Sequence, residues 1–183
     1  MKPVHFLLVA LLLFITPAYA NGGECAFDAK GLERLKIGDP ETKIREVFAK
    51  GYDIIEDSGG MAQRRVEIRK SSSTLRLYSF SMNNSDQVIF IDIFSACKNA
   101  DGIGIGSRLG DARKRYGKAK LESTDAGYFV IFDRIPTIGF MLENKDLPKK
   151  LRNLPDDSLS AKAERSILAT PSAKFSQIRI YPE

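Results

Sequence analysis

Short segments in which apolar residues alternate with polar ones recur along most of this chain. Val66 and Ile68, for example, alternate with three charged residues, which is the period of a strand with one buried face. Clusters of Gly, Ser, Asn and Asp, which favour turns, separate these segments. The pattern predicts strands over residues 52–56, 63–70, 74–82, 87–94, 120–122, 128–133, 137–142 and 176–181.

Two other segments show the helical period. Ile44, Val47 and Phe48 follow the spacing i, i+3, i+4 and form one apolar stripe. Asp39 is the expected N-cap of this helix, and Gly51 is expected to end it. A second helix is predicted from the same order of features: the cap Ser107, the stripe Leu109, Ala112 and Tyr116, and the final Gly117.

Each predicted helix is followed by four predicted strands, so the fold class expected is α+β. The expected architecture is a tandem repeat of helix plus antiparallel β-meander in a single domain, 21–183, with repeats at about 33–98 and 99–183. The two sets of strands can join edge to edge into one sheet with the helices on one face. The run 88–93 is largely apolar, so its strand is expected at the centre.

The second repeat carries about thirty additional residues, 143–173, before its last strand. Leu147, Leu151 and Leu154 are spaced i, i+4, i+7, and they predict a helix with Asp146 as its cap. A further helix is expected within 160–169. The architecture therefore includes a helical insertion in the second repeat.

The same insertion supplies the candidate partner-binding residues. Lys149, Lys150 and Arg152 lie between the leucines and are expected to face outward, where they can meet an acidic partner. The alternative is that the insertion is a lid, in which the leucines seal the core and the basic residues keep the surface polar.

The first twenty residues have the three parts of a secretory signal. Lys2 is followed by the apolar run 6–15 and by Ala18-Tyr19-Ala20, which has the small residues that signal peptidase requires. The run is too short to span a bilayer as a helix, which disfavours an uncleaved anchor. No small-residue box precedes Cys25, which disfavours a lipoprotein. We expect cleavage after Ala20 and a periplasmic or secreted protein.

Export changes the chemistry that the chain can perform. His5, the single histidine, lies in the signal, so Ser-His-Asp and Cys-His catalysis and His-ligated metals are not expected. Cys25 and Cys97 are expected to form a disulfide in an oxidising compartment, with two free thiols as the alternative. The excess of 28 basic over 23 acidic residues is mild, so the basic residues form either an ordinary solvated face or an electrostatic contact surface. We expect no cofactor and no metal.

Two groups of residues are candidate sites. The segment 102–107, Gly-Ile-Gly-Ile-Gly-Ser, invites comparison with phosphate loops, but its spacing differs and a tight turn explains the glycines better. Asp92 interrupts an apolar strand, and if it is buried it must be paired or protonated. The structural explanation is a partner arginine across the sheet, or exposure of Asp92 at a bulge. A carboxylate-driven hydrolase would draw on Asp53, Glu56, Glu67 and Asp92.

The two helical units, 37–51 and 105–117, also carry a resemblance. An Ile-Gly pair, a capped amphipathic helix, an aromatic residue and a final glycine before a meander resemble the repeat of the β-lactamase-inhibitory-protein fold. They also resemble the small lipoprotein of the outer-membrane β-barrel assembly machine. The tandem arrangement and the early cysteine fit the inhibitor-like group better, although no inhibitory residue of that group matches a position here.

These observations favour an exported binding module that acts through protein–protein contact, as an inhibitor or an immunity-like protein, and not an enzyme. The alternative is a structural or assembly accessory of the cell envelope, and a carboxylate-driven hydrolase comes third. The expected partner is another exported or envelope protein. Nucleic acid is disfavoured by the compartment, no integral membrane span is expected, and the oligomeric state stays open.

Overall fold

The computed structural model describes residues 25–57, 64–71, 76–124, 127–152 and 160–183. The expected export signal, residues 1–20, lies outside these ranges. Over the described ranges the chain forms ten β-strands and three α-helices. In this part of the chain no helix is both long and apolar enough to cross a membrane.

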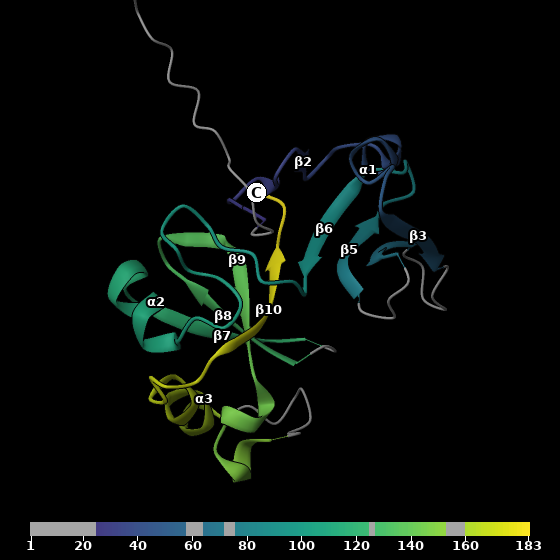
Figure 1. Ribbon diagram of the computed structural model, residues 1–183. Helices are drawn as coiled ribbons and strands as arrows, with labels where there is room; N and C mark the ends of the chain where they lie inside the picture. Colours follow the sequence, from purple (N-terminus) through teal and green to yellow (C-terminus); the bar gives the residue numbers. More distant parts are fainter. Residues whose placement is uncertain (1–24, 58–63, 72–75, 125–126, 153–159) are drawn as a thin grey trace, which may run out of the picture.

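An antiparallel sheet of eight strands dominates the molecule (Figure 1). Its strands lie in the order β3-β4-β5-β6-β10-β9-β8-β7. Their bounds are β3 Tyr52–Asp57, β4 Arg65–Lys70, β5 Arg76–Met82, β6 Val88–Ile93, β7 Ala119–Thr124, β8 Gly127–Phe132, β9 Ile135–Leu142 and β10 Phe175–Ile180. β6 and β10 pair at the centre, so the strand of the 88–93 run takes the central position predicted for it.

The main core lies between one face of this sheet and the helices α1 (Glu41–Val47) and α2 (Leu109–Tyr116). Ile44, Phe48, Leu109 and Tyr116 are buried in one cluster with alternate residues of the strands. Both helices therefore cover the same face, and they do so with the predicted stripes. The strands contribute Val66, Ile68, Tyr78, Phe80, Ile91, Ile93, Val130, Phe132, Phe140, Ile178 and Ile180.

The predicted α+β fold class is wrong. The chain is mostly antiparallel β-structure, an eight-stranded sheet and a two-stranded sheet with three short helices, and not a tandem repeat of helix plus meander. The α-helices have only seven or eight residues, about two turns each. Apolar periodicity located the helical segments but not their length, because a stripe of three apolar residues fits a short helix as well as a long one. The helical share of the fold was therefore overestimated.

The predicted caps of the first two helices are also wrong. Pro40 and Arg108 occupy the N-cap positions, and neither makes a side-chain cap. The Asp39 carboxylate accepts a backbone N–H of the preceding turn at 2.8 Å, and Ser107 Oγ accepts another at 3.0 Å. These polar side chains stabilise the turns that lead into the helices. Gly117 ends α2 with φ +83°, as predicted for a glycine stop.

Cys25 and Cys97 form the predicted disulfide, with Cα atoms 4.7 Å apart and a sequence separation of 72. It joins the segment before β1 (Gly31–Leu32) and β2 (Leu35–Lys36), which form the two-stranded sheet, to the chain that leaves β6. Closing a loop of this length stabilises a fold by about 4 kcal/mol in the chain-entropy account. A disulfide of this kind is typical of proteins outside the cytoplasm.

The glycines of 102–107 form a turn, in agreement with the structural interpretation. Gly102 and Gly106 have φ of +76° and +83°. A Cβ on Gly104 would lie 1.9 Å from the carbonyl oxygen of Cys97, so only glycine fits this close approach.

The insertion 143–173 differs from the predicted helix at its start. Two 3-10 turns, η1 (Asn144–Asp146) and η2 (Lys149–Leu151), replace it, and Leu154 lies outside the described residues. Pro148 accounts for the break, because proline disfavours helical geometry in the residue before it. Asp146 lies inside η1, and its carboxylate accepts the Lys174 N–H at 2.9 Å instead of capping a helix.

The second helix of the insertion is present as α3 (Ala161–Leu168). Ser160 caps it, since its hydroxyl oxygen accepts the Ala163 N–H at 3.2 Å. Leu147 and Ile167 are buried in the main core. At both ends, therefore, the insertion packs against the body of the protein.

Candidate functional site: the helix-free face of the sheet

The second face of the eight-stranded sheet, which α1 and α2 do not cover, is called here the helix-free face. Directly paired residues of neighbouring antiparallel strands point to the same side. The strand registers place one residue of each strand in a single row on this face: Ile55, Glu67, Ser79, Asp92, Arg179, Gly139, Ile131 and Lys120. The row carries acids and bases, whereas most strand residues on the opposite side are buried in the core.

Asp92 and Arg179 form the centre of the row, on β6 and β10. Arg179 donates from Nε to Asp92 Oδ1 at 2.7 Å and from Nη2 to Oδ2 at 2.9 Å. Gln177 adds an Nε2 hydrogen bond to Oδ1 at 2.9 Å. The buried carboxylate is thus paired with an arginine across the sheet, which confirms the structural interpretation of Asp92.

Aromatic side chains surround this ion pair. The Arg179 guanidinium carbon lies 5.1 Å from the ring centroid of Phe129 and 5.8 Å from that of Phe90. Tyr181 meets Phe90 edge to face with centroids 5.8 Å apart, and burial raises the pKa of Tyr181 to about 12. A Cβ on Gly139 would lie 3.0 Å from both the Phe129 and the Tyr181 ring, so the glycine makes room for this packing.

A second arginine–aromatic cluster lies at the β4–β5 end of the row. The Glu67 carboxylate accepts from Arg76 Nη1 at 2.7 Å and from Arg69 Nη2 at 3.0 Å. The Arg76 guanidinium carbon lies 4.1 Å from the ring centroid of Phe94. Burial raises the pKa of Glu67, but the hydrogen bonds from the two arginines outweigh it and leave the pKa below its usual value.

Arg69 and Arg76 keep about a third of their side chains in solvent, with exposed fractions of 34% and 40%. The buried carboxylate of Glu67 therefore fixes both guanidinium groups, while the exposed parts of the two side chains can still contact a partner. Sequence reasoning missed this cluster. The available signal was the alternation of Arg65, Glu67 and Arg69 on one strand, which places all three on one face.

The four carboxylates weighed for hydrolysis are not brought together as a free pair. Glu67 and Asp92 lie in the same row with Ser79 between them, and each is bound by its own arginines. Asp53 is exposed on β3, and its Oδ1 accepts the Ser71 hydroxyl at 3.0 Å. A cavity of about 270 Å³ near the end of β10 is lined by Lys30, Lys36 and Glu183, among others, and by none of the four.

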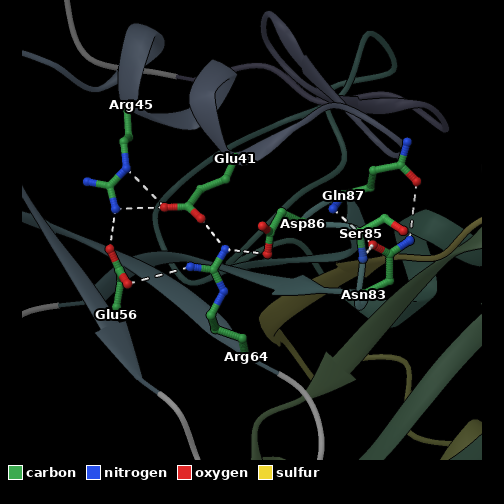
Figure 2. A network of polar contacts seen from close by, with 8 residues as sticks. All are labelled: Glu41, Arg45, Glu56, Arg64, Asn83, Ser85, Asp86 and Gln87. Carbon is green, nitrogen blue, oxygen red and sulfur yellow. Dashed lines mark hydrogen bonds and ion pairs between the residues drawn. The ribbon is translucent and has the colours of Figure 1, made fainter.

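Glu56 belongs to an ion-pair network on the other side of β3 (Figure 2). Glu41 accepts from Arg45 Nε at 2.9 Å and also from Arg64, while Arg64 donates to Asp86 at 2.8 Å. Glu56 binds Arg45 and lies 3.5 Å from Arg64. The network ties α1 to β3 and to the β5–β6 turn, with three carboxylates for two guanidinium groups.

Comparison with known proteins gives a fold and no function. The chain is similar to the crystal structure of the uncharacterized protein yfeY from Escherichia coli, with a TM-score of 0.59 and 14% sequence identity. The similarity covers 87% of this chain and 100% of that one. No family model matches the chain, and no curated protein matches it. At this identity the similarity shows the fold alone.

The three basic residues of the insertion differ in how exposed their side chains are. Lys149 and Lys150 are exposed in η2. Arg152 is half-buried and turns back on the chain, because its Nε donates to the Leu147 carbonyl at 3.0 Å and its Nη2 to the Lys145 carbonyl at 2.5 Å. Lys149 and Lys150 are therefore accessible, whereas Arg152 holds the turn. Within the described ranges, no three His, Cys, Asp or Glu side chains gather as metal ligands do.

Proposed function

We propose that this chain is an exported binding module and that the helix-free face is its contact surface for another exported or envelope protein. One observation carries the proposal: Arg76, whose side chain is 40% exposed, lies on the ring of Phe94 on this face. Arg179 with Phe90 and Phe129 forms a second arginine–aromatic cluster that is largely buried, and it supports the surface from within. Arginine and aromatic side chains are enriched in the contact surfaces of proteins and supply most of the binding energy there.

Fixed side chains support the same proposal. Glu67 holds Arg69 and Arg76, and Asp92 holds Arg179, so these side chains already occupy one conformation before a partner arrives. Binding then costs less side-chain entropy. The accessible donors of Arg69 and Arg76 favour a partner that presents carboxylates or carbonyl oxygens.

The alternatives find less support. An envelope accessory that works through an apolar patch needs several exposed apolar side chains, and among the described residues Tyr52 is the large apolar side chain that is exposed. A carboxylate-driven hydrolase needs two carboxyl groups that face one substrate bond, whereas Glu67 and Asp92 are occupied by arginines. The disulfide and the signal sequence support a periplasmic or secreted location.

Charge reversal on the face tests the proposal. Arg65 is exposed and lies two positions from Glu67 on the same strand, so Arg65→Glu changes the helix-free face without removing an arginine from Glu67 or Asp92. We expect Arg65→Glu to reduce partner retention from an envelope extract at least tenfold, about 1.4 kcal/mol. Lys114→Glu on the exposed side of α2 is the matched control and should leave retention unchanged. Equal retention by both variants would contradict the proposal.

Lys149 and Lys150 form a second candidate contact, which the same assay separates from the first. If the insertion is part of the recognising surface, the double variant Lys149→Glu, Lys150→Glu should also lose retention at low salt. Unchanged retention by this variant would make the insertion a lid. The helix-free face would then be the contact surface on its own.

A further inference from the structure

The two edge strands of the eight-stranded sheet, β7 and β3, differ in how far other parts of the chain cover them. β7 forms one edge, and α3 packs beside it. Glu164 of α3 accepts the outward backbone N–H of Leu121 at 3.1 Å. The Glu164 side chain thus accepts the hydrogen bond that an added strand would otherwise accept from Leu121. Covering backbone donors in this way is a common means of protecting a sheet edge from pairing.

β3 forms the other edge, and no described strand or helix pairs with its outer side. Ser71 N–H donates to the Gly51 carbonyl at 3.2 Å, and this bond fixes which groups point toward β4. Because inward and outward groups alternate along an antiparallel strand, the N–H and C=O of Tyr52, Ile54 and Glu56 point away from the sheet. No described residue is bonded to these outward groups.

An exposed aromatic ring lies on the same edge. Tyr52 is 38% exposed, whereas the other large apolar side chains of the described ranges are more covered. Its ring meets Phe48 edge to face with centroids 5.2 Å apart. One side of the ring is therefore fixed by the core helix and the other is free for contact.

We propose that a second copy of this chain pairs with this edge, β3 against β3 in antiparallel orientation, centred on Ile54. This register places Ile54 opposite its counterpart, Tyr52 opposite Glu56 of the second copy, and Asp53 opposite Ile55. No carboxylate then faces another carboxylate. The proposal goes beyond partner binding, since it uses an edge and not the helix-free face.

The two neighbouring registers are unfavourable, so the register centred on Ile54 is favoured over both. A shift of two positions in one direction places Asp53 opposite Asp53, and a shift in the other places Asp53 opposite Asp57. Like charges directly opposite each other destabilise a strand pair. The same acids oppose pairing with an unrelated acidic strand.

In the proposed pair, Tyr52 of one copy lies opposite Glu56 of the other, so the negative charge around Glu56 makes substitutions at Tyr52 a test of the contact. Glu41, Glu56 and Asp86 outnumber Arg45 and Arg64 in the network of Figure 2, so a residue opposite Glu56 meets a site with a net negative charge. Tyr52→Glu adds a carboxylate there, and Tyr52→Lys adds an ammonium group. Because Tyr52 is exposed, both variants should fold, which their thermal unfolding checks.

Sedimentation equilibrium of the purified, disulfide-bonded protein tests the proposal. A single strand pair is smaller than a standard interface, so we expect a weak dimer that forms between about 10 µM and 1 mM. Tyr52→Glu should weaken it at least tenfold, while Tyr52→Lys should leave it unchanged or tighten it. A wild-type protein that stays monomeric to about 1 mM, or two variants that weaken the dimer equally, would overturn the proposal.

Hydrogen exchange places the contact. The Ile54 amide should exchange more slowly as the protein concentration rises, whereas the Leu121 amide on the closed edge should not change with concentration. A dimer that protects other amides and leaves Ile54 unaffected would show that the copies meet elsewhere, and it would contradict the assignment to β3.

Discussion

At the scale of single residues, buried acids in the sheet are each held by arginines from a neighbouring strand or from their own. The sequence indicated that Asp92 needs a partner, but it could not select Arg179, because the two residues are 87 positions apart and meet only through the β6–β10 pair. Glu67 was one of several candidate acids, and nothing local distinguished it. Which acid pairs with which base depends on strand order, and strand order is a non-local property.

Glu67 makes a prediction about pH. Its pKa is lowered in the folded protein, so its ion pairs stabilise the fold above the ordinary glutamate pKa of 4.5, and this stability is lost as the pH falls through the folded value. Glu67→Gln should cost about 1–3 kcal/mol at pH 7. Urea unfolding at pH 7 and pH 3 should show the difference between the two proteins shrinking at pH 3.

The control for this prediction is Glu46→Gln on the exposed side of α1, where an i, i+3 pair with Lys43 is largely in solvent. This variant should lie within about 0.5 kcal/mol of the wild type at both values of pH. If Glu67→Gln shows the same loss of stability at pH 3 as at pH 7, the ion pairs of Glu67 do not stabilise the fold in the way described.

At the scale of elements, the eight strands of the large sheet lie within a few residues of their predicted bounds, β1 and β2 were not predicted, and the helices are shorter than predicted. Strand alternation is a strong signal because every second residue of β4 and β5 faces the core. The sequence signal for helix length is weak, because α1 and α2 each bury only a short apolar stripe. The insertion was predicted as two helices, but its described part before α3 forms two 3-10 turns on either side of Pro148.

The closed edge of the sheet makes a prediction at this scale. Glu164→Gln keeps the shape of the side chain but weakens the bond to the Leu121 N–H, because the charge-assisted acceptor becomes neutral. Glu164→Ala removes the bond. We expect the Leu121 amide to exchange faster in the order wild type, Gln variant, Ala variant. Lys162→Ala, at an exposed position of α3, should leave this amide unchanged. Equal exchange in all four proteins would show that the carboxylate does not close the edge.

At the scale of the whole molecule, one side of the sheet is a core covered by helices and the other carries the arginine–aromatic clusters. The sequence predicted the disulfide and the apolar stripes of α1 and α2, because these follow from cysteine count and apolar periodicity. It left open whether the strands join into one large sheet, and the structure shows that they do. The sequence did not predict the helix-free face as a site. Its residues are dispersed over all eight strands and come together only when the registers are known.

Photo-cross-linking in the exporting cell tests the central claim most directly. A photoreactive phenylalanine analogue placed at Phe94 lies on the helix-free face beside Arg76, and the same analogue at Lys114 lies on the outer side of α2. The account predicts a discrete adduct with one envelope protein from position 94, lost with Arg65→Glu, and none from position 114. An adduct from position 114 alone, or the same adduct from both positions, would contradict it.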